Sequence, residues 1–120
     1  MGKITFEEFV CVMSYSVPKY DSGGNESSCI EIEFDVDGCS EYQECWMGKM
    51  VDRNNEKKYV YWFGLVPDGS QAYDFDTFEQ FANAKVFHGK SIKEIWGSIS
   101  VASLCGGLIH ETLPFYLEQS

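Results

Sequence analysis

The segment CIEIEFDVD, residues 29–37, decides the fold of this chain. Apolar residues at its even positions alternate with acids at its odd positions: Ile30, Ile32, Phe34 and Val36 against Glu31, Glu33, Asp35 and Asp37. Successive side chains of a β-strand point to opposite faces of the sheet, so a strict period of two predicts a strand with one buried face. We therefore expect a sheet whose first strand turns a row of carboxylates to the surface.

Two further apolar runs follow this segment after short turns. The turn DGCSE leads into YQECWMGKMV, residues 42–51, and DRNNEK leads into KYVYWFGLV, residues 58–66. Short connections predict an antiparallel meander, to which QAYDF, residues 71–75, adds a fourth short strand. The run 58–66 is apolar on both faces, so we expect it to be covered on both sides; the alternative is an aromatic face left bare for a partner.

The N-terminal residues 5–14 have the pattern of a short helix. Thr5 with Glu8 three residues later forms a capping box, and apolar residues recur at helical spacing. Gly2 and Glu8 also stand where an EF-hand has its loop glycine and its last calcium ligand, so this short stretch resembles the calmodulin family locally. The ligands at the first, third and fifth loop positions would precede Met1, and we therefore expect no calcium binding.

The C-terminal half predicts short helices and a last strand. TFEQFANAKVF, residues 77–87, has helical spacing, and SIKEIW, residues 91–96, begins a third helix with a capping box of Ser91 and Glu94. Residues 98–105 alternate like a strand, so we expect a last strand there, ended by two glycines at 106 and 107; the alternative is an extension of the third helix. The predicted aromatic core consists of Phe6, Phe9, Phe34, Tyr61, Phe63, Phe78, Phe81 and Trp96.

Together these elements predict an α+β fold: an antiparallel β-meander of three to five strands with two or three short helices packed on one face. The length of 120 residues and the 44% of apolar residues suit a single compact domain over residues 1–120. No apolar run approaches the roughly 20 residues that cross a bilayer, so we expect a cytoplasmic protein without membrane contact.

The composition excludes several classes of function. Nineteen acids against nine bases give a net charge of −10, which disfavours direct nucleic-acid binding through a basic groove. Five cysteines without a CxxC pair indicate reduced thiols, and we expect no metal and no cofactor. The two histidines, His88 and His110, lie in no catalytic motif. We therefore expect no catalytic residue and no enzyme.

The acids of residues 29–37 form the best candidate site. Alternate residues on a strand lie about 6.6 Å apart, so these carboxylates repel one another. Cations could neutralise them, and would come either from Lys49, Lys57 and Lys58 or from the surface of a partner. Duplex DNA carries a charge every ~3.4 Å along each strand, so mimicry of nucleic acid would require a second acidic row, from Glu41, Glu44 and Asp52. The predicted partner-binding residues are Glu31, Glu33, Asp35, Asp37, Glu41 and Glu44.

This pattern favours a small acidic inhibitor that masks the basic, nucleic-acid-handling surface of a partner protein. Immunity and anti-CRISPR proteins are often compact and acidic, and the analogy is one of size and charge. The alternative is a structural or regulatory interaction domain that uses exposed aromatic residues such as Trp46, Tyr61 and Trp62; a homodimer is one form that it could take.

Overall fold

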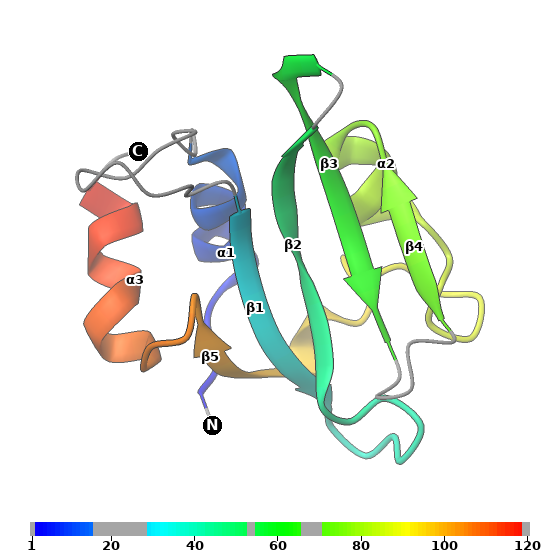
Figure 1. The fold of residues 1–120 in the computed structure, drawn as a ribbon. Helices are drawn as coiled ribbons and strands as arrows, with labels where there is room; N and C mark the ends of the chain where they lie inside the picture. The colour runs from blue at the N-terminus through cyan, green and yellow to red at the C-terminus, as the bar shows by residue number, and fades with distance from the viewer. Residues whose placement is uncertain (1, 16–28, 53–54, 66–70, 119–120) are drawn as a thin grey trace.

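The computed structural model describes residues 2–15, 29–52, 55–65 and 71–118, with the side chains of residues 55–57 left out. Figure 1 shows the sheet with the labelled helices α1 and α2 behind it and α3 at its side. The elements in chain order are α1 (Phe6–Ser14), β1 (Cys29–Val36), β2 (Cys45–Asp52), β3 (Asn55–Gly64), β4 (Ala72–Phe75), α2 (Phe78–Asn83), the 3₁₀ helix η1 (Trp96–Ser98), β5 (Ile99–Leu104) and α3 (Ile109–Glu118).

The sheet has five antiparallel strands in the order β4-β3-β2-β1-β5. Its first four strands follow one another as the predicted meander. The last strand crosses back to pair with β1, and a register shift between Glu33 and Phe34 accommodates that pairing. The predicted α+β fold is confirmed, and β1 lies inside the sheet rather than at its edge.

The core lies between the sheet and helices α1 and α2. Ile30, Ile32 and Phe34 of β1 are fully buried on that face, as their alternation predicts. The rings of Phe63 and Phe81 stack with centroids 4.1 Å apart, joining β3 to α2. The predicted aromatic core is confirmed: four of its rings are buried (Phe9, Phe34, Phe63, Phe81) and four pack partly buried against them (Phe6, Tyr61, Phe78, Trp96).

The first helix begins as its sequence predicts. The Thr5 hydroxyl accepts a hydrogen bond from the Glu8 amide (3.0 Å), and the Glu8 carboxylate accepts one from the Thr5 amide (2.8 Å). This reciprocal capping satisfies two amides that the first helical turn leaves without partners. The Glu8 carboxylate is therefore part of the helix cap, and this role explains a glutamate at this position.

The predicted helix at residues 91–96 is wrong, although its capping hydrogen bonds form between Ser91 and Glu94. The chain makes turns there and then the short η1 helix. Trp96 stacks on Phe9 at 4.5 Å and donates its indole N–H to the Ile4 carbonyl at 2.8 Å. These contacts with the N-terminal segment fix the tryptophan where a regular helix would have continued.

Helix α3 was not predicted, because Pro114 lies inside it and two glycines precede it. A proline in a helix interior removes one backbone hydrogen bond and usually interrupts the helix. Here Leu113 and Tyr116 are buried, and Tyr116 packs edge-on against Tyr15 at 5.3 Å. Tertiary packing therefore stabilises a helix that local propensity disfavours.

Candidate functional site: the open face of the sheet

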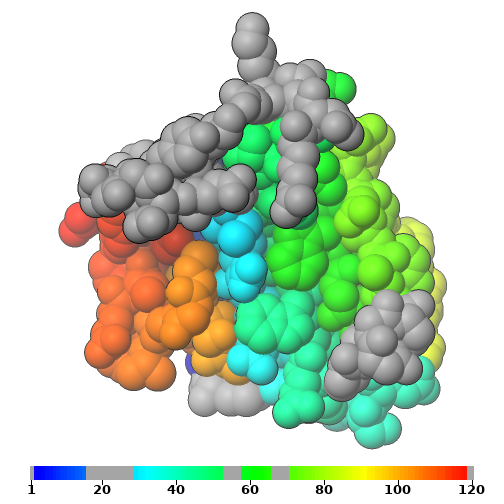
Figure 2. Space-filling model, viewed as in Figure 1, coloured from blue at the N-terminus to red at the C-terminus, as the bar shows by residue number. Residues whose placement is uncertain are grey.

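The sheet face opposite α1 and α2 carries the candidate site, and we call it the open face. Within the described ranges, no helix lies across it (Figure 1), and atoms of β1, β2 and β3 are visible at its surface in Figure 2. The strand register places two rows of residues side by side across this face: Glu31, Gly48, Trp62 and Asp74 in one, and Ser103, Glu33, Trp46, Gly64 and Ala72 in the next. Carboxylates and tryptophans are therefore neighbours here.

Three of the predicted acids, Glu31, Glu33 and Asp35, form an acidic row along β1. Glu31 is exposed and the other two are half-buried. The Ser103 hydroxyl donates to Glu33 at 3.5 Å, and the Glu44 amide donates to Asp35 at 2.6 Å. Among the described residues no lysine lies within ion-pair distance of these carboxylates. The row therefore keeps its negative charge without a cation from the described part of the chain.

The other predicted acids lie outside this row. Asp37 pairs with Lys3 and accepts a hydrogen bond from the Ser100 hydroxyl at 2.7 Å, and the hydrogen bond from Lys3 holds the pKa of Asp37 below its usual value. Glu41 lies 3.1 Å from His88 in the connection between β1 and β2. Asp37 and Glu41 thus have partners within the chain, and neither extends the row.

The second acidic row that nucleic-acid mimicry would require does not form. Glu44 and Asp52 stand at opposite ends of β2, and the positions between them on the open face are Trp46, Gly48 and Met50. The acidic row of β1 is therefore bordered by aromatic and apolar side chains. Its neighbours suit a cationic side chain, which an indole and a carboxylate can contact together.

Trp46 and Trp62, which the sequence analysis named only for the alternative function, lie on the same face as the acidic row. Trp46 is 38% exposed and lies directly across from Glu33. Trp62 is half-buried because its indole lies over Gly48: a Cβ at Gly48 would stand 3.1 Å from the Trp62 ring and 1.8 Å from the Ile30 carbonyl oxygen. Tyr61 instead faces the core, where it packs against Phe78. The expectation that both faces of this strand are covered is not met by the described residues.

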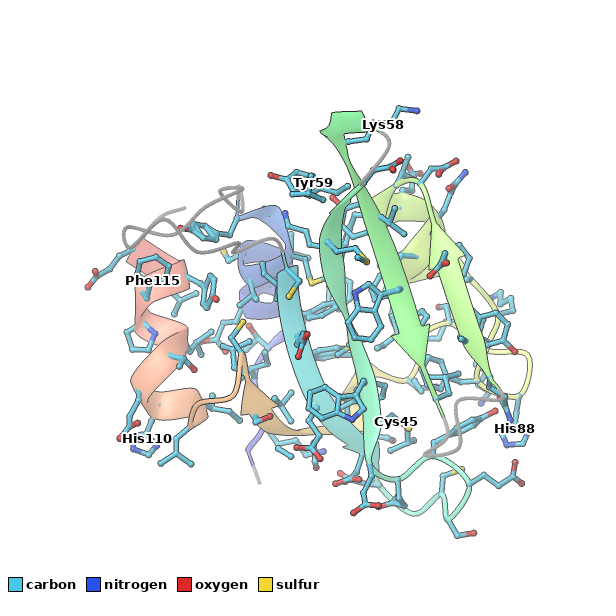
Figure 3. All side chains as sticks on the ribbon, in the orientation of Figure 1. Cys45, Lys58, Tyr59, His88, His110 and Phe115 are labelled. Atoms are coloured by element: carbon cyan, nitrogen blue, oxygen red, sulfur yellow. The ribbon has the colours of Figure 1, made fainter. Side chains whose placement is uncertain are left out.

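We expected that lysines of the sheet could neutralise the acidic row, and for Lys49 this expectation is wrong. This side chain is 1% exposed on the core face, where its ammonium donates to the Met13 carbonyl at 2.7 Å and lies 4.2 Å from the Tyr59 ring centroid. Burial lowers the pKa of Lys49 to about 8. Lys58 stands at the far end of the hairpin from Cys45 (Figure 3), and the side chain of Lys57 is outside the described residues.

The described residues offer little to a metal ion. They contain no group of three or more histidine, cysteine or acidic side chains that could hold one, and all five cysteines are free thiols. Cys45 is buried and donates to the Leu65 carbonyl at 2.8 Å, and burial raises its pKa to about 12. Its thiol therefore behaves as a small core residue.

Comparison of the chain with protein-family models, curated proteins and solved structures found no match. The described helices include none that is both long and apolar enough to span a membrane.

Proposed function

We propose that this protein is a small acidic inhibitor that binds a basic surface of a nucleic-acid-handling protein through its open face. The observation that carries the proposal is the position of the acidic row beside Trp46 and Trp62. Carboxylates attract lysine and arginine at a distance, and exposed indole rings bind the same cations by cation–π contact after docking.

The charge of the chain supports this choice of partner. A net charge of −10 repels phosphates and acidic proteins, and it steers a basic protein toward the surface. The row alone is about half as dense as the phosphates of one DNA strand. We therefore propose competition with nucleic acid for the partner's basic side chains, rather than imitation of a duplex.

The test compares two double variants that change the net charge equally. Glu31→Lys with Glu33→Lys reverses the acidic row, whereas Glu7→Lys with Glu118→Lys places the same charges on exposed positions of α1 and α3. A partner captured from the native cell and identified should be a basic nucleic-acid-binding protein. Its association should slow at least tenfold in the first variant and much less in the control, and nucleic acid should compete for it.

Two outcomes would contradict the proposal. The first is a partner that is not basic, and the second is equal binding by the two double variants. A salt titration adds an independent check, because association driven by the acidic row weakens as salt increases.

The alternative function is a homodimer formed through the same face. The exposure of Trp46 beside Trp62 favours it, since two copies could pack their indoles together. The acidic rows would then repel each other, so self-association should strengthen with salt. Analytical ultracentrifugation at low and high salt separates this alternative from binding of a basic partner.

A further inference from the structure

The two edge strands of the sheet, β5 and β4, differ in the backbone hydrogen bonds that the described residues make to their outer sides. At the outer side of β5, Gly2 and Val101 exchange two backbone hydrogen bonds of 3.0 and 2.8 Å, and Leu104 and Gly107 exchange two more of 3.0 Å. At the other edge, β4 pairs with β3, and no other strand of the described residues pairs with it. Figure 1 shows the outer side of β4 at the right of the sheet.

The register identifies which backbone groups of β4 face outward. The Leu65 amide donates to the Gln71 carbonyl at 2.9 Å, so Leu65 and Gln71 form a hydrogen-bonded pair. Such pairs alternate with non-hydrogen-bonded pairs in an antiparallel ladder. Ala72 and Asp74, opposite Gly64 and Trp62, therefore point their N–H and C=O groups away from β3.

The next outward position shows where this open edge ends. The Asp76 amide donates to the Gln80 side chain at 3.2 Å, so α2 satisfies it. Ala72 and Asp74 thus place four backbone groups on the side of β4 away from β3, and no backbone group in the described part of the chain bonds to them. Backbone groups in this arrangement are a template for an added strand.

A shallow hollow lies beside this edge and has an acidic lining. Its volume is about 450 Å³, and its lining residues are Asp74, Phe75, Asp76, Gln80, Asn83 and Ala84. Two of these lining residues are acidic, and none of them is basic. Charge complementarity therefore selects an occupant with lysine or arginine side chains.

We propose that the outer edge of β4 takes up an extended basic segment of a partner protein as a sixth strand. Ala72 and Asp74 supply the backbone hydrogen bonds, and the carboxylates of Asp74 and Asp76 bind the basic side chains. A second copy of this chain is disfavoured as the occupant, because it carries a net charge of −10 and would bring Asp74 against an acidic surface. The Asp74 side chain shares the open face, but the backbone edge of β4 is separated from the acidic row of β1 by β3 and β2, and pairing at this edge does not require the acidic row.

Hydrogen exchange tests the pairing directly. The probe is an eight-residue peptide of alternating lysine and threonine, and the control peptide replaces each lysine by glutamate. Saturating basic peptide should slow exchange of the Ala72 and Asp74 amides at least tenfold, and the acidic peptide should not. The Tyr73 and Phe75 amides, which already face β3, should change little. Absence of saturable protection at Ala72 and Asp74 would overturn the proposal.

Proline substitutions separate backbone pairing from charge. Asp74→Pro removes an outward donor without removing a β3 hydrogen bond, and proline is tolerated on edge strands in this orientation. It should weaken binding of the basic peptide at least tenfold, and more than Asp74→Asn does, because the asparagine keeps the N–H. Ala72→Pro tests the same point where Asp74→Pro does not fold. Equal binding by the proline and asparagine variants would overturn the proposal.

Two controls distinguish binding at this edge from a general effect of charge and from self-association. Glu111→Gln removes one negative charge from an exposed position of α3, as Asp74→Asn does from β4, so it should bind the basic peptide as tightly as the native protein does. Protection of the β4 amides that rises with protein concentration in the absence of peptide would show that a second copy occupies the edge. That result would overturn the choice of partner, whatever the fate of the proposed inhibitor function.

Discussion

Each face of β2 carries one side chain that is unusual for its surroundings. On the core face, Lys49 is buried among aromatic rings, while on the open face Trp46 is 38% exposed next to Glu33. The lysine is held there because the Met13 carbonyl, in the last turn of α1, lacks an intrahelical partner and accepts its hydrogen bond. A cation at a helix C-terminus is also favoured by the helix dipole. Burial of a side chain in this sheet thus depends on the elements that pack against its face. From polarity alone, Lys49 would have been placed on the surface and Trp46 in the core.

The largest effect should come from removing a ring of the core face. Phe63→Ala deletes the stack with Phe81 and should lower the free energy of unfolding by about 3–5 kcal/mol. Trp46→Ala, on the open face, should cost about 1 kcal/mol or less, although it removes a larger side chain. Urea unfolding of the two variants measures the contrast. Comparable losses would show that the open face is packed as tightly as the core.

The pH dependence of Lys49 should give the next largest effect. Its pKa is about 8 in the folded protein and 10.5 in the unfolded chain, so the unfolded chain holds the extra proton between these values. The contribution of Lys49 to stability should therefore be constant below pH 8 and rise by about 3 kcal/mol as the pH approaches 10.5.

The measurement is the difference in unfolding free energy between the native protein and Lys49→Met from pH 7 to 10. Taking the difference cancels the buried Cys45, whose pKa of about 12 makes stability fall above pH 9 in both proteins. Lys93→Met, at an exposed lysine, provides the control curve. A difference that stays flat across this range would show that Lys49 is not held in a desolvated site.

Alanine substitutions at Gly48 and Gly64 should differ in their effect on stability, because the two glycines differ in how closely other atoms approach them on the open face. Gly48→Ala would place a Cβ 1.8 Å from the Ile30 carbonyl oxygen and against Trp62, so we expect a loss of about 2 kcal/mol. At Gly64 a Cβ would meet only the Trp46 Cβ at 4.0 Å, so Gly64→Ala should be neutral or slightly stabilising. Thermal unfolding of both variants gives the comparison. Equal stability of the two would mean that β1 and Trp62 do not approach Gly48 closely.

Only a small effect on folding is expected from reversing the charges of the acidic row. Glu31→Lys with Glu33→Lys should change the unfolding free energy by less than about 1 kcal/mol, since no described lysine pairs with either carboxylate. Denaturant unfolding at low and high salt is the measurement. A large loss of stability would show that the row is paired within the chain and is not a free surface.

The sequence by itself determined the parts of this protein that depend on local patterning. The alternation in residues 29–37 predicted β1 and its buried face, and Thr5 with Glu8 predicted the start of α1. The short turns predicted the meander of β1 to β4. Each of these signals is contained within about ten residues, because strand periodicity, capping and turn geometry are local properties of the chain.

Only the tertiary structure decided which distant residues meet. It pairs β5 with β1, forms α3 around Pro114 by burying Tyr116, and sets Trp46 beside Glu33 by the register of two strands. It also turns Lys49 inward to the end of α1, although the charge of this residue predicted a surface position. A shift of one residue in register would exchange the two faces of β2, so its face assignment depends on contacts from the whole fold. The candidate site depends on this assignment. The sequence could therefore predict that Glu31, Glu33 and Asp35 share one face, but not that Trp46 and Trp62 lie beside them on it.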